Sequence, residues 1–188
     1  MPQITKQIIV HEVGHLVIGF VLGFKQQGIQ FAGDLPQNQV ARAWYDTSAN
    51  PQLLAKQCLA GVLSECEIFP ECLSPNLLNA YRHSVIITSS HPHFNDLTEA
   101  DRKSMSGTTD LENARDFARS VVGSSESAIC KFLIVCESDT RDLVRSRATD
   151  IKNVVDDIQM WLQTPDAKYD PNMLYDIERA KRLLGSTS

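Results

Sequence analysis

A run of apolar residues near the N-terminus, residues 8–24, is the feature that most restricts how this chain can fold. It approaches the length that crosses a membrane, but His11, Glu12 and His15 interrupt it. Ionisable side chains are costly in hydrocarbon, so a membrane span is disfavoured. A signal peptide fits no better, because Lys6 is the only early charge and no small-residue cleavage site follows. The sequence therefore predicts a buried helix of a soluble protein.

Length and composition are those of an ordinary globular protein. The chain has 188 residues, 43% apolar and 22% charged, which suits one domain or two small ones and excludes disordered and fibrous classes. The net charge is -5 and the basic residues are scattered, so no nucleic-acid partner is expected. The five cysteines form an odd set without a C-x-x-C pair, which indicates a reducing compartment. We therefore expect a cytoplasmic protein.

Helix signals dominate the chain, so we expect a mainly α fold with at most a short strand or hairpin. The first helix is predicted over about residues 5–22, before a glycine that suits a helix end. Alternating apolar residues followed by Gly, Asp and Pro allow the strand or hairpin at 28–36. A second helix is predicted over 51–69, opened by an Asn-Pro pair, and its apolar stripe includes Glu65.

The middle of the chain lacks the clear helix pattern of the first 69 residues. Residues 72–103 are rich in Pro, Ser, Asn and His and are expected to form a long loop or insertion, with one short helix near 77–82. Residues 109–112 read as a capping box that opens a helix, with Ala114 and Val121 among its inward residues. The remaining predicted elements are a buried segment of undecided type at 129–136 and two helices, from Thr140 to Leu162 and from Asp170 to Gly185.

His11, Glu12 and His15 form a His-Glu-x-x-His pattern on the first predicted helix. At roughly 100° per residue, positions 11 and 15 lie about 40° apart, so both imidazoles can bind one metal ion. Neutral imidazoles suit Zn²⁺, and two of them leave room for a third ligand and a water. Glu12 would take a proton from that water and hand it to the leaving amine. The motif therefore predicts a zinc site with Glu12 as its catalytic residue.

The third ligand lies outside this motif. A metzincin would have a glycine and a histidine where this chain has Ile18 and Val21. A thermolysin-like site would have a glutamate on the following helix, but none occurs between Val13 and Ser64. The ligand is therefore distant in sequence. The candidates are Glu65, His91, His93, Asp96, Asp101 and Asp110.

Among these candidates we favour Asp110. It shares the apolar face of its helix, and the helix dipole at the first turn keeps its carboxylate ionised for a metal. The alternative is an acid that only supports the helix start. Glu65 is either an acceptor for the imidazole N–H behind the metal or a half-exposed edge residue. His91 and His93 lie in a proline-containing loop, where such histidines are more often solvated than ligating.

Three blocks of the sequence resemble the zinc protease domain of the FtsH-type AAA+ proteases. The first is His-Glu-Val-Gly-His at 11–15, and the second, Leu-Ala-Gly-Val-Leu-Ser-Glu at 59–65, is similar to the family's Ala/Gly-Gly-Arg-x-Ala-Glu-Glu helix. The third, at 106–114, looks like the family's Thr-Gly-Ala-x-Asn-Asp-Leu-x-x-Ala segment with one residue fewer. The resemblance implies a compact helical zincin-type domain over residues 1–188, with Asp110 as the third zinc ligand.

The resemblance also implies peptide-bond hydrolysis. No phosphate-binding loop of the G-x-x-x-x-G-K-[ST] type occurs, so we expect no ATP hydrolysis by this chain. We therefore expect a zinc metallopeptidase acting on peptides or unfolded protein, as a homo-oligomer or with a separate ATPase chain. The alternative is a non-catalytic, zinc-stabilised domain that acts through protein partners, suggested by the changed second block and by the insertion at 72–103. A zinc hydrolase for a non-peptide substrate is a third option.

Overall fold

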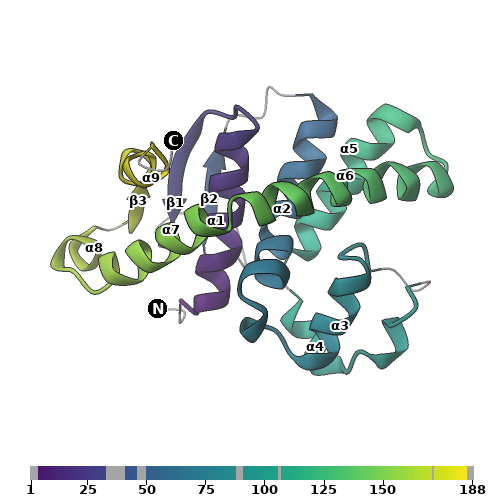
Figure 1. Cartoon of the computed structure of the whole chain (residues 1–188), viewed down its shortest axis with the longest axis horizontal. Helices are drawn as coiled ribbons and strands as arrows, with labels where there is room; N and C mark the ends of the chain where they lie inside the picture. The colour runs from purple at the N-terminus through teal and green to yellow at the C-terminus, as the bar shows by residue number, and fades with distance from the viewer. Residues whose placement is uncertain are drawn as a thin grey trace.

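The computed structural model describes residues 4–32, 41–45, 50–87, 91–105, 107–170 and 172–185. Over these residues the protein is mainly helical, as expected, with one small sheet (Figure 1). The helices are α1 (Lys6–Val21), α2 (Pro51–Ile68), α3 (Pro75–His83), α4 (Glu99–Ser104), α5 (Thr108–Val122), α6 (Glu126–Ser146), α7 (Ala148–Trp161), α8 (Pro165–Tyr169) and α9 (Ile177–Leu184), with 3-10 turns η1 (Pro70–Cys72) and η2 (Phe94–Asp96). The strands are β1 (Gln26–Gln30), β2 (Arg42–Tyr45) and β3 (Leu174–Asp176).

Helices α1 and α2 form the centre of the molecule. The Thr5 hydroxyl caps α1 by accepting from the amide of Ile8 (3.3 Å), and the carboxamide oxygen of Asn50 caps α2. Both predicted helices are therefore confirmed. Buried residues occur all round α1, which is typical of a helix that is covered on every side.

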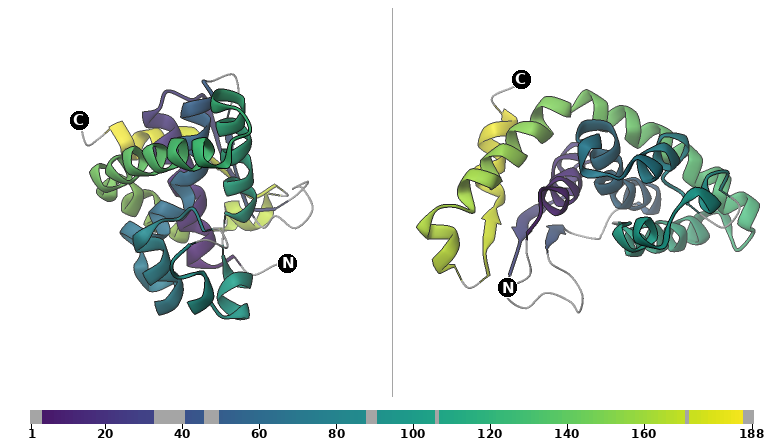
Figure 2. Two further views of the ribbon diagram at one scale, coloured as in Figure 1. Left: turned by 90° about the vertical axis from the view of Figure 1, so that its right-hand side faces the viewer. Right: turned by 90° about the horizontal axis from the view of Figure 1, so that it is seen from below.

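The remaining elements enclose this pair. Helix α5 packs on α2, the sheet packs against α1, and α6 contacts α2 while α7 contacts α1. Seen from below, α6 and α7 follow one another as a curved arch over the two central helices (Figure 2). The arch breaks at Arg147, so the single helix predicted from Thr140 to Leu162 is wrong; Thr140 lies inside α6, which also contains the undecided segment 129–136.

The sheet has three strands in the order β2-β1-β3, whereas at most a short strand or hairpin was expected. Strand β2 lies beyond the predicted range 28–36, and β3, which pairs antiparallel with β1, lies where the helix from Asp170 was predicted. Its partner is distant in sequence, so local periodicity carries no sign of this pairing. Gly28 in β1 has φ +134°, and a Cβ there would lie 2.3 Å from the carbonyl oxygen of Tyr175. The turn predicted near 33–36 lies outside the described residues.

The start of α5 also differs from the prediction. No capping box forms at 109–112; Gly107, in the left-handed region at φ 74°, precedes the helix instead. A capping box is present at the start of α4, between Thr98 and Asp101. On the predicted inner face of α5, Ala114 is buried but Val121 is 50% exposed.

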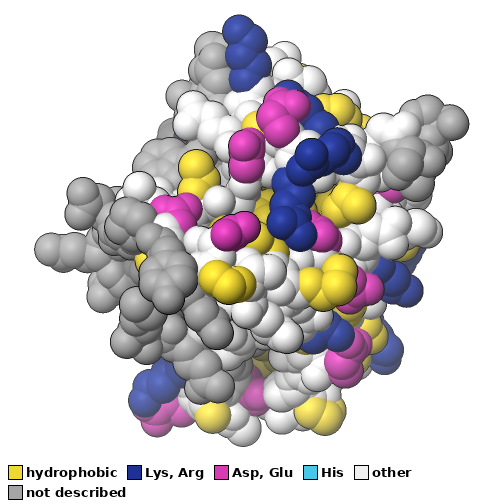
Figure 3. Space-filling view, turned by 90° about the vertical axis from the view of Figure 1, so that its left-hand side faces the viewer, with side chains coloured by type: hydrophobic (Ala, Val, Ile, Leu, Met, Phe, Trp, Pro, Cys, Tyr) yellow, Lys and Arg dark blue, Asp and Glu magenta, His cyan; other side chains and the backbone are white. Residues whose placement is uncertain are grey.

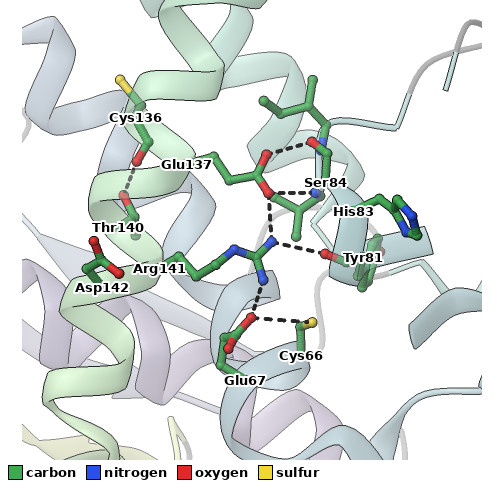
Figure 4. A network of polar contacts seen from close by, with 12 residues as sticks. Cys66, Glu67, Tyr81, His83, Ser84, Cys136, Glu137, Thr140, Arg141 and Asp142 are labelled. Carbon is green, nitrogen blue, oxygen red and sulfur yellow. Dashed lines mark hydrogen bonds and ion pairs between the residues drawn. The ribbon is translucent and has the colours of Figure 1, made fainter. Parts of the chain in front are cut away.

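The segment between α2 and α5, predicted as a loop, carries α3, α4 and two short turns, and α3 confirms the short helix expected near 77–82. A network of polar contacts fastens it to α6 and α2 (Figure 4). Arg141 of α6 donates to Glu137 (2.7 Å), to the carbonyl of Tyr81 (3.0 Å) and to Glu67. Glu137 in turn accepts from the hydroxyl of Ser84 (2.6 Å). Because these groups are mostly buried and mutually paired, they fix the end of α3 on the body of the molecule.

The face that carries β3 and α7–α9 has a mixed surface. Lys and Arg side chains lie beside Asp and Glu side chains there, and hydrophobic side chains are scattered among them (Figure 3). Within the described ranges, no helix combines the length and the apolar character that a membrane crossing requires.

Candidate metal centre

Three ligand-type atoms converge between α1 and α5. Nε2 of His11 lies 3.1 Å from Nε2 of His15, and Oδ2 of Asp110 lies 2.9 Å and 3.3 Å from these two nitrogens. Helix α1 places both imidazoles on its buried face, one turn apart, and the first turn of α5 supplies the carboxylate. Among the residues that the structure describes, this is the one group of three or more His, Cys, Asp or Glu side chains able to hold a metal ion.

The arrangement fits a tetrahedral metal ion. Ligand atoms at zinc bond lengths of about 2.0–2.1 Å are roughly 3.3 Å apart in a tetrahedron, close to the separations observed here. Space for the two imidazoles depends on Gly61 of α2. A Cβ at this position would lie 2.6 Å from Cε1 of His11 and 2.7 Å from Nε2 of His15. Because Gly61 has no side chain, it leaves room for both imidazole rings to approach α2.

The carboxylate of Glu65 fixes the His11 ring on the side opposite the metal position. Nδ1 of His11 donates to Oε1 of Glu65 at 2.7 Å, and Glu65 is fully buried. The side-chain amide of Gln7 donates to the other oxygen of Glu65, also at 2.7 Å. With the proton fixed on Nδ1, Nε2 faces the metal position. Glu65 therefore lies where an acceptor behind the metal was expected, rather than at a half-exposed edge.

His15 is held by Gln57, a residue that the sequence reasoning missed. Nδ1 of His15 donates to the backbone oxygen of Gln57 (2.8 Å), and the side-chain amide of Gln57 donates to the backbone oxygen of His15 (2.7 Å). A signal was present in the sequence: Gln57, Gly61 and Glu65 are spaced by four, so they follow one another on one face of α2. That face is the one that meets the two imidazoles.

Charge favours a cation at this centre. Burial would raise the pKa of Asp110, but the charge of His15 and hydrogen bonds from His11 and His15 outweigh it and hold the pKa well below its ordinary value. Burial would lower the pKa of His11, but its hydrogen bonds to Asp110 and Glu65 raise that pKa well above its ordinary value. The carboxylates of Glu65 and Asp110 therefore favour a positive charge between them. A protonated His11 supplies such a charge, and so would a divalent metal ion.

Glu12 lies at the edge of this centre, in a cleft of about 580 Å³. Its Oε2 accepts a hydrogen bond of 2.6 Å from the backbone amide of Ala43 in strand β2. The cleft is bounded by the N-terminal half of α1, by β2, and by the segment that joins α4 to α5. Its lining includes Ile8, Glu12, Ala41, Arg42, Ala43, Lys103, Met105, Thr108 and Asn113.

Apart from Glu65, which lies behind His11, the other candidates for the third ligand lie elsewhere. Asp101 caps α4, where it accepts from the hydroxyl of Ser74 (2.5 Å) and the amide of Thr98 (2.8 Å). These hydrogen bonds lower the pKa of Asp101 to about 2, with the Ser74 hydroxyl as the largest cause. His93 and Asp96 pair with each other at 2.8 Å, apart from the centre. Of the six candidates, only Asp110 joins the two histidines of the motif.

Comparison with known proteins did not identify a relative of this chain. Neither a protein-family model nor a curated protein matches this chain. Membership of the FtsH-type protease family therefore stays a prediction, carried by three sequence blocks. Residues from all three meet at this centre, since His11 comes from the first, Gly61 and Glu65 from the second, and Asp110 from the third.

Proposed function

We propose that this protein is a zinc-dependent metallopeptidase in which His11, His15 and Asp110 hold Zn²⁺ and Glu12 is the general base. The observation that carries the proposal is the convergence of three ligand atoms, 2.9–3.3 Å apart, beside a carboxylate that lines the same cleft. Two imidazoles and one carboxylate are a common donor set for catalytic zinc.

The chain's own residues supply the proton transfers and the positioning. Zn²⁺, when bound, polarises the scissile carbonyl and lowers the pKa of the attacking water to about 7. Glu12 takes a proton from that water and returns it to the leaving amine. The amide of Ala43 holds Oε2 of Glu12, so Oε1 would be the oxygen that takes the proton. Glu65 and Gln57 keep the proton of each histidine on Nδ1.

The cleft suits an extended chain as substrate. Strand β2 is at one edge of the sheet, and residues 41–43 form one wall of the cleft beside Glu12. An extended peptide can add to such an edge through main-chain hydrogen bonds, which do not depend on its sequence. In a folded protein most backbone N–H and C=O groups are already paired within its own secondary structure. The proposed substrates are therefore peptides and unfolded segments, cleaved without ATP by this chain alone.

A second function is supported by the same contacts. The three ligands come from α1 and α5, so a bound ion would cross-link these two helices, and the hydrogen bond from His11 to Glu65 joins α2 to the same centre. Metal that binds only the folded state stabilises it. A non-catalytic, zinc-stabilised domain acting through protein partners is therefore the rival to the peptidase.

Glu12→Gln separates the two functions. The variant keeps all three ligands, so we expect one zinc ion at this centre in both proteins, no detectable cleavage of denatured casein by the variant, and chelator-sensitive cleavage by the wild type. Glu71→Gln is the control, because Glu71 is an exposed partner of Lys6. Equal cleavage by the Glu12 variant and the wild type would refute the general-base role. A wild type that zinc stabilises against heat but that cleaves no peptide or denatured protein would refute the peptidase proposal and favour the rival function.

A further inference from the structure

Two imidazoles face each other away from the centre just described. His83 is the last residue of α3, and His93 directly precedes η2. Their Nε2 atoms are 3.4 Å apart, and the rings are inclined by 55° with centroids 4.3 Å apart. Both residues lie in the segment between α2 and α5, which the proposed peptidase chemistry does not use.

Hydrogen bonds fix the protonation of both rings. Nδ1 of His93 lies 2.8 Å from a carboxylate oxygen of Asp96, and Nδ1 of His83 lies 3.0 Å from the backbone oxygen of Asn79. Carboxylate and carbonyl oxygens only accept, so each Nδ1 carries the hydrogen and donates it. The amide nitrogen of Asn79 also lies near Nδ1 of His93, but at 3.4 Å it is farther away than the Asp96 oxygen, which therefore decides the tautomer. In the neutral rings each Nε2 then carries a lone pair. Two lone pairs thus face each other across 3.4 Å.

We propose that His83 and His93 form a second, peripheral site for a divalent transition metal ion, with zinc as the test ion. Facing lone pairs repel each other unless a cation lies between them. A separation of 3.4 Å matches the edge of a tetrahedron with metal–nitrogen bonds of about 2.0–2.1 Å. The carboxylate of Asp96 behind His93 repeats the acid–histidine pairing that accompanies metal-ligating histidines.

The surroundings suit an ion that completes its coordination with water. The side chain of His93 is 23% exposed, and His83 is exposed. The α3 side of the site is rigid, because Arg141 donates to the carbonyl of Tyr81 and Glu137 accepts from Ser84, on either side of His83 (Figure 4). Closure on one ion therefore takes rotation of the imidazoles about χ2 rather than movement of α3.

An ion held here would tie η2 to the end of α3. The chain continues from η2 into α4, which contains Lys103, and then to Met105; both residues line the cleft beside Glu12. The second site would therefore fasten the segment that ends at one wall of the cleft. Its existence does not depend on the proposed peptidase activity.

Asparagine substitutions test the site with little disturbance, because the asparagine amide can replace the Nδ1–H donor while it removes Nε2. We expect His83→Asn and His93→Asn each to bind one fewer Zn²⁺ per chain than the wild type, or to weaken that ion at least about tenfold. The measurement is equilibrium dialysis with metal analysis. His91→Asn is the matched control: Nδ1 of His91 accepts from the amide of His93 (3.1 Å), which an asparagine oxygen can also do.

Two results would overturn the second site. One is zinc stoichiometry and affinity in His83→Asn and His93→Asn equal to those of the wild type, which would mean that the rings share only a proton. The other is an equal loss in the His91→Asn control, which would mean that the loss follows from disturbance of the loop. His15→Asn separates the two sites, since it should remove an ion in addition to the one lost through His83→Asn. Circular dichroism of each variant checks that it is folded.

Discussion

The backbone amide of Ala43 in strand β2 donates a 2.6 Å hydrogen bond to Oε2 of Glu12 in helix α1. An element at the edge of the sheet thereby contacts the carboxylate that flanks the two histidines. Because the donor is a backbone group, its position depends on the strand rather than on the Ala43 side chain. The orientation of Glu12 is therefore coupled to the position of the strand that forms a wall of the cleft.

Removal of this amide should impair catalysis without loss of metal. In Ala43→Pro the N–H is absent, so the Glu12 carboxylate loses its fixed orientation and we expect peptide cleavage to fall between about 10- and 100-fold. Zinc content should stay equal to that of the wild type. Ala43→Gly keeps the amide and should retain most of the activity. Cleavage by the proline variant at the wild-type rate would show that the contact does not position the base.

Glu65 should matter for metal affinity. Glu65→Ala leaves Nδ1 of His11 without its buried acceptor, and we expect zinc affinity to fall about 10- to 100-fold, measured by competition with a chromophoric chelator. Glu67→Ala is the matched control two residues further along α2. It removes ion pairs with Arg141 and Arg145, so it should lower the melting temperature but not the zinc affinity. Equal losses of affinity in both variants would contradict a specific role for Glu65.

Gly61→Ala should disturb the metal centre although alanine favours helices. The new methyl group would lie 2.6–2.7 Å from atoms of His11 and His15, so the rings must move or α2 must shift. Overpacking of this kind costs about 1–3 kcal/mol, more than the helix propensity gained. We expect a lower melting temperature and zinc affinity reduced at least tenfold. Gly185→Ala, which meets no atom within 4 Å, should change neither.

Asp157 should stabilise the fold in a pH-dependent way. It accepts hydrogen bonds from the hydroxyl of Tyr175 (2.7 Å) and from Nε of Arg179 (2.5 Å), and Arg179 is the largest cause of its lowered pKa. Asp157→Asn should lower the free energy of unfolding by about 1–2 kcal/mol at neutral pH. The value is kept small because Arg179 is partly exposed and solvent weakens its ion pair with Asp157. Urea unfolding measures this difference. The exposed neighbour Asp156 provides a control, since Asp156→Asn should have little effect.

The sign of the pH effect follows from the lowered pKa. The stabilisation by Asp157 is present above its ordinary pKa of about 4 and is lost as pH falls through the lowered pKa of the folded protein. The wild type and Asp157→Asn should therefore differ most at neutral pH and converge under more acidic conditions. A difference that does not change between pH 7 and pH 3 would contradict ionic stabilisation.

Local signals predicted the parts of the fold that depend on local physics. Thr5, and Asn50 with Pro51, mark helix starts through capping, and the structure has both helices where those residues require them. Strands β2 and β3 were not predicted, and Leu174–Asp176 was missed because it gains its partner from β1, far away in sequence. The break near Arg147 was missed because the apolar face of the predicted helix continues on both sides of it.

The centre was predictable where spacing within one helix decides geometry. His11 and His15 meet because they are one turn apart, and Asp110 was favoured because its helical face was apolar. Glu65 was a candidate because it lies on the apolar stripe of its helix, but its contact with His11 depends on how α2 packs on α1. Gln57 binds His15 through its backbone oxygen as well as through its side-chain amide, so its residue type gave only part of the signal, and the four-residue spacing to Gly61 and Glu65 gave the rest.

Strand β1 joins two distant parts of the chain. On one side it pairs with β2, whose amide contacts Glu12, and on the other with β3, close to the C-terminus. The last described segment contains β3 and α9. It contributes no residue to the lining of the cleft, but β3 supports the sheet whose strand β2 forms one wall of the cleft. Shortening the chain before Leu174 would turn β1 into an edge strand and loosen the support of β2. Truncations at this end therefore affect a cleft whose histidine motif lies near the N-terminus.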